Sequence, residues 1–158
     1  LMEAAEILGD ETIINKMRLL CIKMAGAVER VGLDKDGGLF LESTRFGSHI
    51  RTNKHWWLQA ETLVGFMNAF EMTGDRKYWE TVKLSWDFID NHVIDHHGGE
   101  WFTKVNRLGK PFLTEPENDP SPYYRNDWKI DPWKCPYHNG RAMMEMVKRI
   151  EQKLKHNE

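Results

Sequence analysis

The 158 residues provide enough chain for one ordinary domain with a single hydrophobic core. Apolar residues make up 41% and charged residues 29%, a balance typical of globular proteins. The net charge of −2 gives no reason to expect nucleic acid or an anionic membrane as a partner, and no apolar run is long enough to span a bilayer. The only cysteines, Cys21 and Cys135, lie far apart in sequence; they favour free thiols in a cytoplasmic protein, with one disulfide as the alternative.

The sequence predicts a chain built mainly of helices. Hydrophobic periodicity and turn residues place helices at 1–8, 11–31, 54–72, 76–93 and 139–154. A short strand is expected at 39–41, and a hairpin with a first arm at 100–105 turns at Leu108 and Gly109. A loop rich in proline and aspartate, 111–137, precedes the last helix.

The helices belong to a repeat. The sequence EILGD at 6–10 returns as EMTGD at 71–75, and DKDGG at 34–38 returns as DHHGG at 95–99. Repeated helical hairpins bury their faces by stacking on neighbours in solenoids or closed toroids. Two units and a final helix cannot close a ring, and the chain opens in helix without a capping residue. We therefore expect residues 1–158 to be the carboxy-terminal part of one larger domain.

Two clusters carry chemistry. The segment 133–141 reads WKCPYHNGR and places His138 at the start of the last helix, behind an aromatic loop. A histidine titrates near neutrality, so it can take and return a proton, and the faces of Trp133 and Tyr137 can stack on sugar rings. The second cluster, KHWWLQAE at 54–61, contains two of the seven tryptophans of the chain. Seven tryptophans are more than a core of this size requires. Together they indicate proton transfer on a carbohydrate.

The helical spacing of the second cluster leaves alternatives open. Trp57 and Glu61 lie four residues apart and share a face, with Trp56 about a quarter-turn aside. One tryptophan is expected to line a cleft and the other to pack between helices. Glu61 is expected to bind a sugar hydroxyl, orient a catalytic group or form a structural ion pair. His138 has a structural hydrogen bond as its alternative role, and Trp133 has core packing.

These clusters, with DGGL at 36–39 and GEWF at 99–102, resemble the N-acylglucosamine 2-epimerase superfamily, and within it most closely the cellobiose 2-epimerases. The resemblance implies an all-α fold, the (α/α)6 barrel, here an incomplete barrel of roughly five to six helices with short β-hairpin loops. It also implies inversion of carbon 2 of the reducing-end glucose of cellobiose or a related β-1,4 disaccharide. Neither a metal nor a redox cofactor is expected.

The same resemblance implies the roles of the site residues. His138 is expected to be one of two acid/base histidines that act through an enediolate, and the partner histidine belongs to a motif just upstream of Leu1 in the family. The residues expected to bind the substrate are Trp133, Trp56, Trp57 and Glu61.

One departure from the family bears on the substrate. The extended segment 111–132, which includes Tyr123, Tyr124, Arg125 and Trp128, lies directly before the catalytic loop and can reshape the sugar pocket. N-acylglucosamine is therefore the alternative substrate, and a non-catalytic carbohydrate-binding module is the alternative from another class. Neither a nucleic acid nor a membrane is expected as a partner, and the oligomeric state stays open.

Overall fold

The computed structural model describes residues 1–43, 50–113 and 126–155. Its helices are α1 (Met2–Leu8), α2 (Glu11–Val31), α3 (Trp56–Thr73), α4 (Arg76–Phe88), the π-helical turn η1 (Ile89–Val93) and α5 (Tyr137–Lys155). Strand β1 (Glu42–Ser43) pairs antiparallel with β2 (Ile50–Arg51), and β3 (Lys54–His55) pairs antiparallel with β4 (Lys104–Val105). The expected helical architecture is confirmed. None of the described helices is long and apolar enough to cross a membrane.

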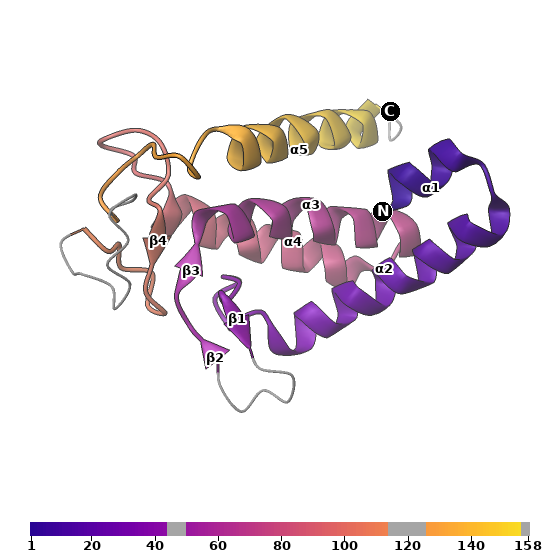
Figure 1. Ribbon diagram of the computed structural model, residues 1–158, viewed down its shortest axis with the longest axis horizontal. Coiled ribbons are helices and arrows are strands. Elements are labelled where there is room, and N and C mark those ends of the chain that lie inside the picture. The colour runs from indigo at the N-terminus through magenta and orange to yellow at the C-terminus, as the bar shows by residue number, and fades with distance from the viewer. Residues whose placement is uncertain (44–49, 114–125, 156–158) are drawn as a thin grey trace.

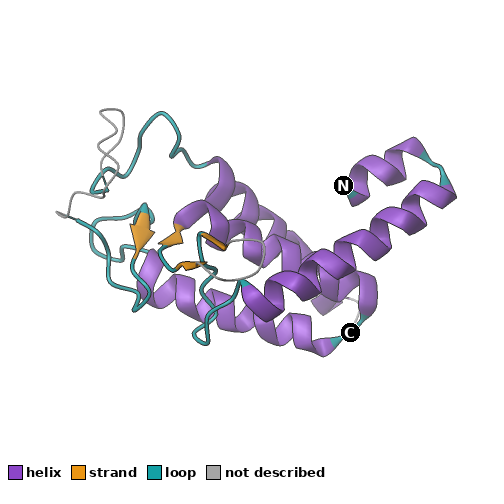
Figure 2. Ribbon diagram, turned by 60° about the horizontal axis from the view of Figure 1, so that its bottom comes forward, coloured by secondary structure: helices purple, strands orange, loops and turns teal. Residues whose placement is uncertain are grey.

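Helix α3 is the centre of the packing (Figure 1). It contacts α2, α4 and α5, and nine of its 18 residues are buried, among them Ala60, Leu63 and Met67 with no exposed surface. A helix buried on several sides has apolar residues around most of its circumference. The strands and loops gather at one end of the helices, and the α1–α2 hairpin extends away from them (Figure 2).

The repeat seen in the sequence is also present in the backbone. Gly9 ends α1 and Gly74 ends α3, each in the left-handed conformation, with φ of 73° and 68°. Glycine adopts this conformation without the steric cost of a side chain. Asp10 and Asp75 then cap the next helices, because their carboxylates accept hydrogen bonds from backbone N–H groups of the first turn. Each Gly-Asp pair therefore ends one helix and begins the next.

The boundaries at the loop end differ from the prediction. Helix α3 begins at Trp56 rather than at Lys54, because Lys54–His55 pair with β4. The strand expected at 39–41 is displaced to Glu42–Ser43, and Leu39 makes only an isolated bridge with Leu33. Tertiary pairing, which residue propensity does not report, decides these positions.

Two helix ends differ from the prediction, and one predicted turn is confirmed. The helix expected at 76–93 turns π-helical at Ile89, where the N–H of Ile94 donates to the Ile89 carbonyl. Helix α5 begins two residues earlier than expected, because the Pro136 carbonyl accepts from the N–H of Gly140. The turn expected near Leu108 is confirmed by hydrogen bonds that close residues 106–110. Tyr123, Tyr124 and Arg125 lie outside the described residues.

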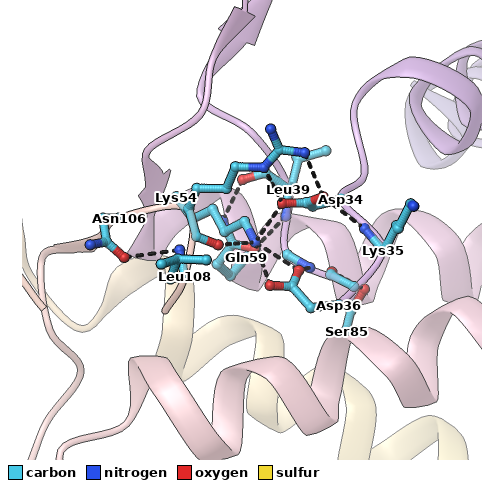
Figure 3. A network of polar contacts seen from close by, with 12 residues as sticks. Asp34, Lys35, Asp36, Leu39, Lys54, Gln59, Ser85, Asn106 and Leu108 are labelled. Carbon is cyan, nitrogen blue, oxygen red and sulfur yellow. Dashed lines mark hydrogen bonds and ion pairs between the residues drawn. The ribbon is translucent and has the colours of Figure 1, made fainter. Parts of the chain in front are cut away.

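A buried lysine joins the loops to the helices (Figure 3). Lys54 is fully buried, and its ammonium lies 2.7 Å from both carboxylate oxygens of Asp36 and 3.3 Å from Asp34. It also donates to the Arg107 carbonyl at 3.1 Å and lies over the ring of Phe88. This charge therefore connects the Gly-Gly loop, β3, the hairpin and α4.

Two neutral side chains extend this network. Gln59 of α3 accepts from the Leu39 N–H at 2.8 Å and donates to the Leu39 carbonyl at 2.9 Å. The hydroxyl of Ser85 on α4 donates to the Gly37 carbonyl at 2.9 Å. The Gly-Gly loop is thus fixed to both helices through its backbone, and to Lys54 of β3 through its two aspartates.

Replacing Lys54 by Met is expected to lower the free energy of unfolding at pH 7 by about 3 kcal/mol, because it leaves the Asp34 and Asp36 carboxylates without their buried partner. Burial raises the pKa of Asp34, but hydrogen bonds from Arg107 and the Lys35 backbone and the charge of Lys54 outweigh it and lower the pKa below 3.8. The contribution of this carboxylate is therefore present above pH 3.8 and is lost as the pH falls through the lowered pKa. Urea titrations at several pH values measure both effects.

The matched control is Lys77→Met, which removes a half-exposed pair with Glu29 at 3.1 Å. A surface pair of this kind contributes less than about 1 kcal/mol. Equal losses in the two variants would contradict a structural role for the buried lysine.

Candidate active site

The two chemical clusters of the sequence meet between α3 and α5. Nδ1 of His138, in the first turn of α5, lies 2.8 Å from Oε1 of Glu61, one turn into α3. Both side chains are about one-third exposed, so they are in contact with solvent and still positioned by the protein. The separation of 77 residues in sequence is closed by the packing of α5 on α3.

Arg141 holds the carboxylate from the other side. Its Nη2 donates to both oxygens of Glu61, at 2.5 and 2.6 Å. Burial raises the pKa of Glu61, but the hydrogen bonds and charges of Arg141 and His138 outweigh it, so the pKa lies below its usual 4.5. The ion pair in turn raises the pKa of Arg141. Glu61 is therefore ionised at neutral pH.

This arrangement assigns the tautomer of His138. An ionised carboxylate only accepts hydrogen bonds, so the Nδ1 atom of His138 must carry the hydrogen that lies between the two groups. The Nε2 atom is then the one that can accept or release a proton. A carboxylate that orients an imidazole and stabilises its cation is the arrangement used for general acid/base catalysis.

Aromatic rings surround the imidazole. The ring centroid of His138 lies 5.4 Å from Trp56 and 5.0 Å from Tyr137, both edge-on, and 5.9 Å from Trp57. Trp56 is 4% exposed and Trp57 38% exposed. Trp56 thus packs edge-on against the imidazole in the core. Trp57 is the tryptophan of this pair that is open to solvent.

Trp133 lies apart from this cluster. Its side chain is 79% exposed, and within the described residues its indole makes no ring contact with His138 or the paired tryptophans. Its backbone N–H donates to the carboxylate of Asp131 at 2.7 Å, which fixes the loop that carries it. The core-packing alternative for Trp133 is therefore wrong, since an indole this exposed does not pack in a core.

A second polar cluster, formed by Lys134, Glu100 and Asn139, was not predicted from the sequence. Lys134 is 1% exposed, and its ammonium donates to Oε1 of Glu100 at 3.1 Å and to the Lys129 carbonyl at 2.7 Å. Asn139, the residue after His138, donates to the same Glu100 oxygen at 2.7 Å. The ammonium of Lys134 also lies 5.2 Å from the ring of Trp56. Burial of a lysine has no local sequence signal, so only the fold reveals this cluster.

Arg141 was also missed as a member of the site, although a signal for it existed. It follows His138 by three residues in a predicted helix, and residues three apart share a face. Two other described histidines, at 96–97, lie in an exposed loop away from the cluster, where His96 contacts Asp90. Cys21 and Cys135 are both free thiols, so the disulfide alternative is wrong.

The chain is similar to proteins of a known family. Residues 3–126 match the family described as N-acylglucosamine 2-epimerase (GlcNAc 2-epimerase). The cellobiose 2-epimerase of Bacteroides fragilis is 38% identical over 147 residues, which cover 93% of this chain and 34% of that protein. The chain therefore spans about a third of the length of the curated relatives that it matches.

Solved structures give the same result. A sugar epimerase from a ruminal bacterium matches with a TM-score of 0.78 and 33% identity, over 92% of this chain and 34% of that one. The cellobiose 2-epimerase of Bacillus thermoamylovorans B4167 matches with a TM-score of 0.68 and 32% identity, over 89% and 32% of the two chains. These matches confirm the expected fold, an incomplete (α/α)6 barrel. Because this family matches most of the chain, residues 3–126, the chain belongs to the N-acylglucosamine 2-epimerase family.

Proposed function

We propose that this chain is the carboxy-terminal part of a sugar 2-epimerase and supplies one of its two acid/base residues, His138. The single observation that carries the proposal is the Glu61–His138 hydrogen bond beside a half-exposed tryptophan. It leaves Nε2 of a fixed imidazole facing away from its carboxylate partner. The second acid/base group comes from the part of the protein that precedes this chain.

The reaction follows from these residues. After the sugar ring opens, a base removes the proton on carbon 2, and the electrons form an enediolate with the neighbouring carbonyl. An acid then delivers a proton to the opposite face of the same carbon, which inverts it. His138 acts as one of these groups through Nε2, and Glu61 stabilises the imidazolium when the ring holds the extra proton. Trp57 and Trp133 offer faces on which sugar rings can stack. Trp56 holds the imidazole in place by packing edge-on against it.

The proposed substrate is cellobiose or a related β-1,4 disaccharide. Support comes from the cellobiose 2-epimerase of Bacteroides fragilis, at 38% identity over nearly the whole chain. The family description favours N-acylglucosamine as the second candidate. The exposed Trp133 is consistent with a site that reaches beyond one ring, because its face is available to a second sugar.

Exposed apolar helix faces support the place of this chain in a larger domain. Large apolar side chains on α2 and α5 are more than 40% exposed, including Leu19, Met24, Met144 and Val147. An apolar groove of about 350 Å³ also runs between α4 and α5. Stacked helical repeats cover such faces with neighbouring helices.

The two free thiols support a reducing, cytoplasmic location for the protein.

The first test follows the intact protein, this chain together with the preceding part, in D2O by NMR. With cellobiose, lactose and N-acetylglucosamine as substrates, we expect deuterium at carbon 2 and the 2-epimer of the preferred sugar. His138→Ala is expected to lower the exchange rate about 10³-fold, because a positioned acid/base group contributes on this order. His96→Ala, in an exposed loop, is the matched control. Saturable sugar binding with no exchange would support the non-catalytic binding module instead.

The second test concerns Arg141. Without its guanidinium, burial is opposed only by His138, so we expect Arg141→Gln to raise the pKa of Glu61. The carboxylate then protonates at a higher pH and ceases to hold the Nδ1 hydrogen of His138. Exchange activity is therefore expected to fall more at pH 5 than at pH 8.

Arg149→Gln is the control for this variant, since it removes a guanidinium two turns further along α5. Its pH profile should match that of the wild type. A parallel profile for Arg141→Gln would contradict the role of Arg141 in keeping Glu61 ionised.

A further inference from the structure

We propose that Glu100 is a positioning residue for His138: it sets the place of the imidazole by holding the first turn of α5 and the loop before it. This inference rests on the proposed function of His138. Three observations carry it, namely the two donors that share one Glu100 oxygen, the burial of those donors, and the backbone conformation of Glu100 itself.

One oxygen of Glu100 holds both segments that flank the imidazole. Oε1 accepts from Nδ2 of Asn139 at 2.7 Å and from the ammonium of Lys134 at 3.1 Å. Asn139 directly follows His138, and Lys134 lies four residues before it. A shift of this carboxylate therefore moves the backbone on both sides of His138 relative to Glu61, whose hydrogen bond depends on that position.

Burial makes these contacts strong. Asn139 is 6% exposed and Lys134 is 1% exposed, so neither donor can exchange Glu100 for water without a rearrangement. Burial raises the pKa of Glu100, but the Trp101 backbone N–H, Lys134 and Asn139 outweigh it and lower the pKa. The carboxylate is therefore charged at neutral pH and compensates the lysine.

The backbone at Glu100 is unusual. Among the described residues it is the one non-glycine residue with a positive φ, 62°. The matching position of the first repeat, Leu39, has no such conformation. A side chain in this region costs conformational energy, and such residues gather where the surrounding structure requires them. A glycine would relieve the strain here, so the presence of glutamate indicates that its carboxylate is needed.

The loop before α5 is held by its own contacts and by contacts to residues 95–103. Asp131 accepts from the N–H groups of Trp133 and Lys134, both at 2.7 Å, and the Asp131 N–H donates to the Lys134 carbonyl. Lys134 also donates to the Lys129 carbonyl. These bonds shape the loop. Its earlier part is joined to the rest of the molecule by Lys129, whose ammonium donates to Asp95 at 2.8 Å, and by the Trp128 carbonyl, which accepts from the Thr103 hydroxyl at 2.8 Å. Glu100, which follows the second Gly-Gly loop, is the contact that joins the last part of this loop, at Lys134, to the first turn of α5, at Asn139.

The test compares Glu100→Ala and Glu100→Gln in the intact protein. Alanine removes both contacts, and glutamine keeps an oxygen that can accept from Asn139 but loses the charge that compensates Lys134. We expect kcat for carbon 2 exchange to fall at least 10-fold in the alanine variant and less in the glutamine variant, with KM within about twofold of the wild type. The control is Glu71→Gln, a carboxylate of similar exposure that contacts α5 at its far end through Arg149.

A second readout is independent of activity. In protein labelled with ¹⁵N-histidine, the Nδ1 signal of His138, assigned by its loss in His138→Ala, reports the hydrogen bond to Glu61. It is expected to shift in Glu100→Ala and to stay in place in Glu71→Gln. An unchanged signal together with an unchanged kcat would overturn the proposal. A wild-type protein with no carbon 2 exchange would overturn the proposed function alone, because the Nδ1 signal still decides whether Glu100 positions the ring.

Discussion

The Glu61 carboxylate is the interaction on which the arrangement of the site depends. It lies on α3, the helix against which α2, α4 and α5 pack, and it meets both His138 and Arg141 of α5. Arg141 keeps it charged against the effect of burial, and its charge in turn fixes the tautomer of the imidazole. Three side chains thus determine which nitrogen of His138 is available for proton transfer.

Two clusters of buried polar side chains lie at the loop end of the helices. Lys54 binds Asp34 and Asp36 and joins the first Gly-Gly loop to β3 (Figure 3). Lys134 binds Glu100 beside the second Gly-Gly loop and the start of α5. Both the Lys54 and the Lys134 ammonium have a carboxylate partner, which offsets the cost of burying their charge. The two repeats therefore use the same device, a buried lysine on an acidic loop residue, at different points of the chain.

Much of the fold was predictable from local patterns. The stops at Gly9 and Gly74 and the caps at Asp10 and Asp75 depend on residues that have strong conformational preferences, and the structure has helix ends at those places. The displaced strand near Leu39 and the earlier start of α3 were not predictable in the same way. Short strands of two residues are set by a partner strand far away in sequence, as Lys54–His55 are by Lys104–Val105.

The sequence by itself determined the helical repeat, the family and the candidate residues His138, Glu61, Trp56 and Trp57, because these depend on spacing and residue type within short segments. Only the tertiary structure decided that Trp56 is buried while Trp57 is open, that Arg141 pairs with Glu61, and that Lys134 and Glu100 meet at the first turn of α5. The physical reason is that burial and charge pairing arise where helices and loops from distant parts of the chain meet. No local pattern records which side of a helix another segment will cover.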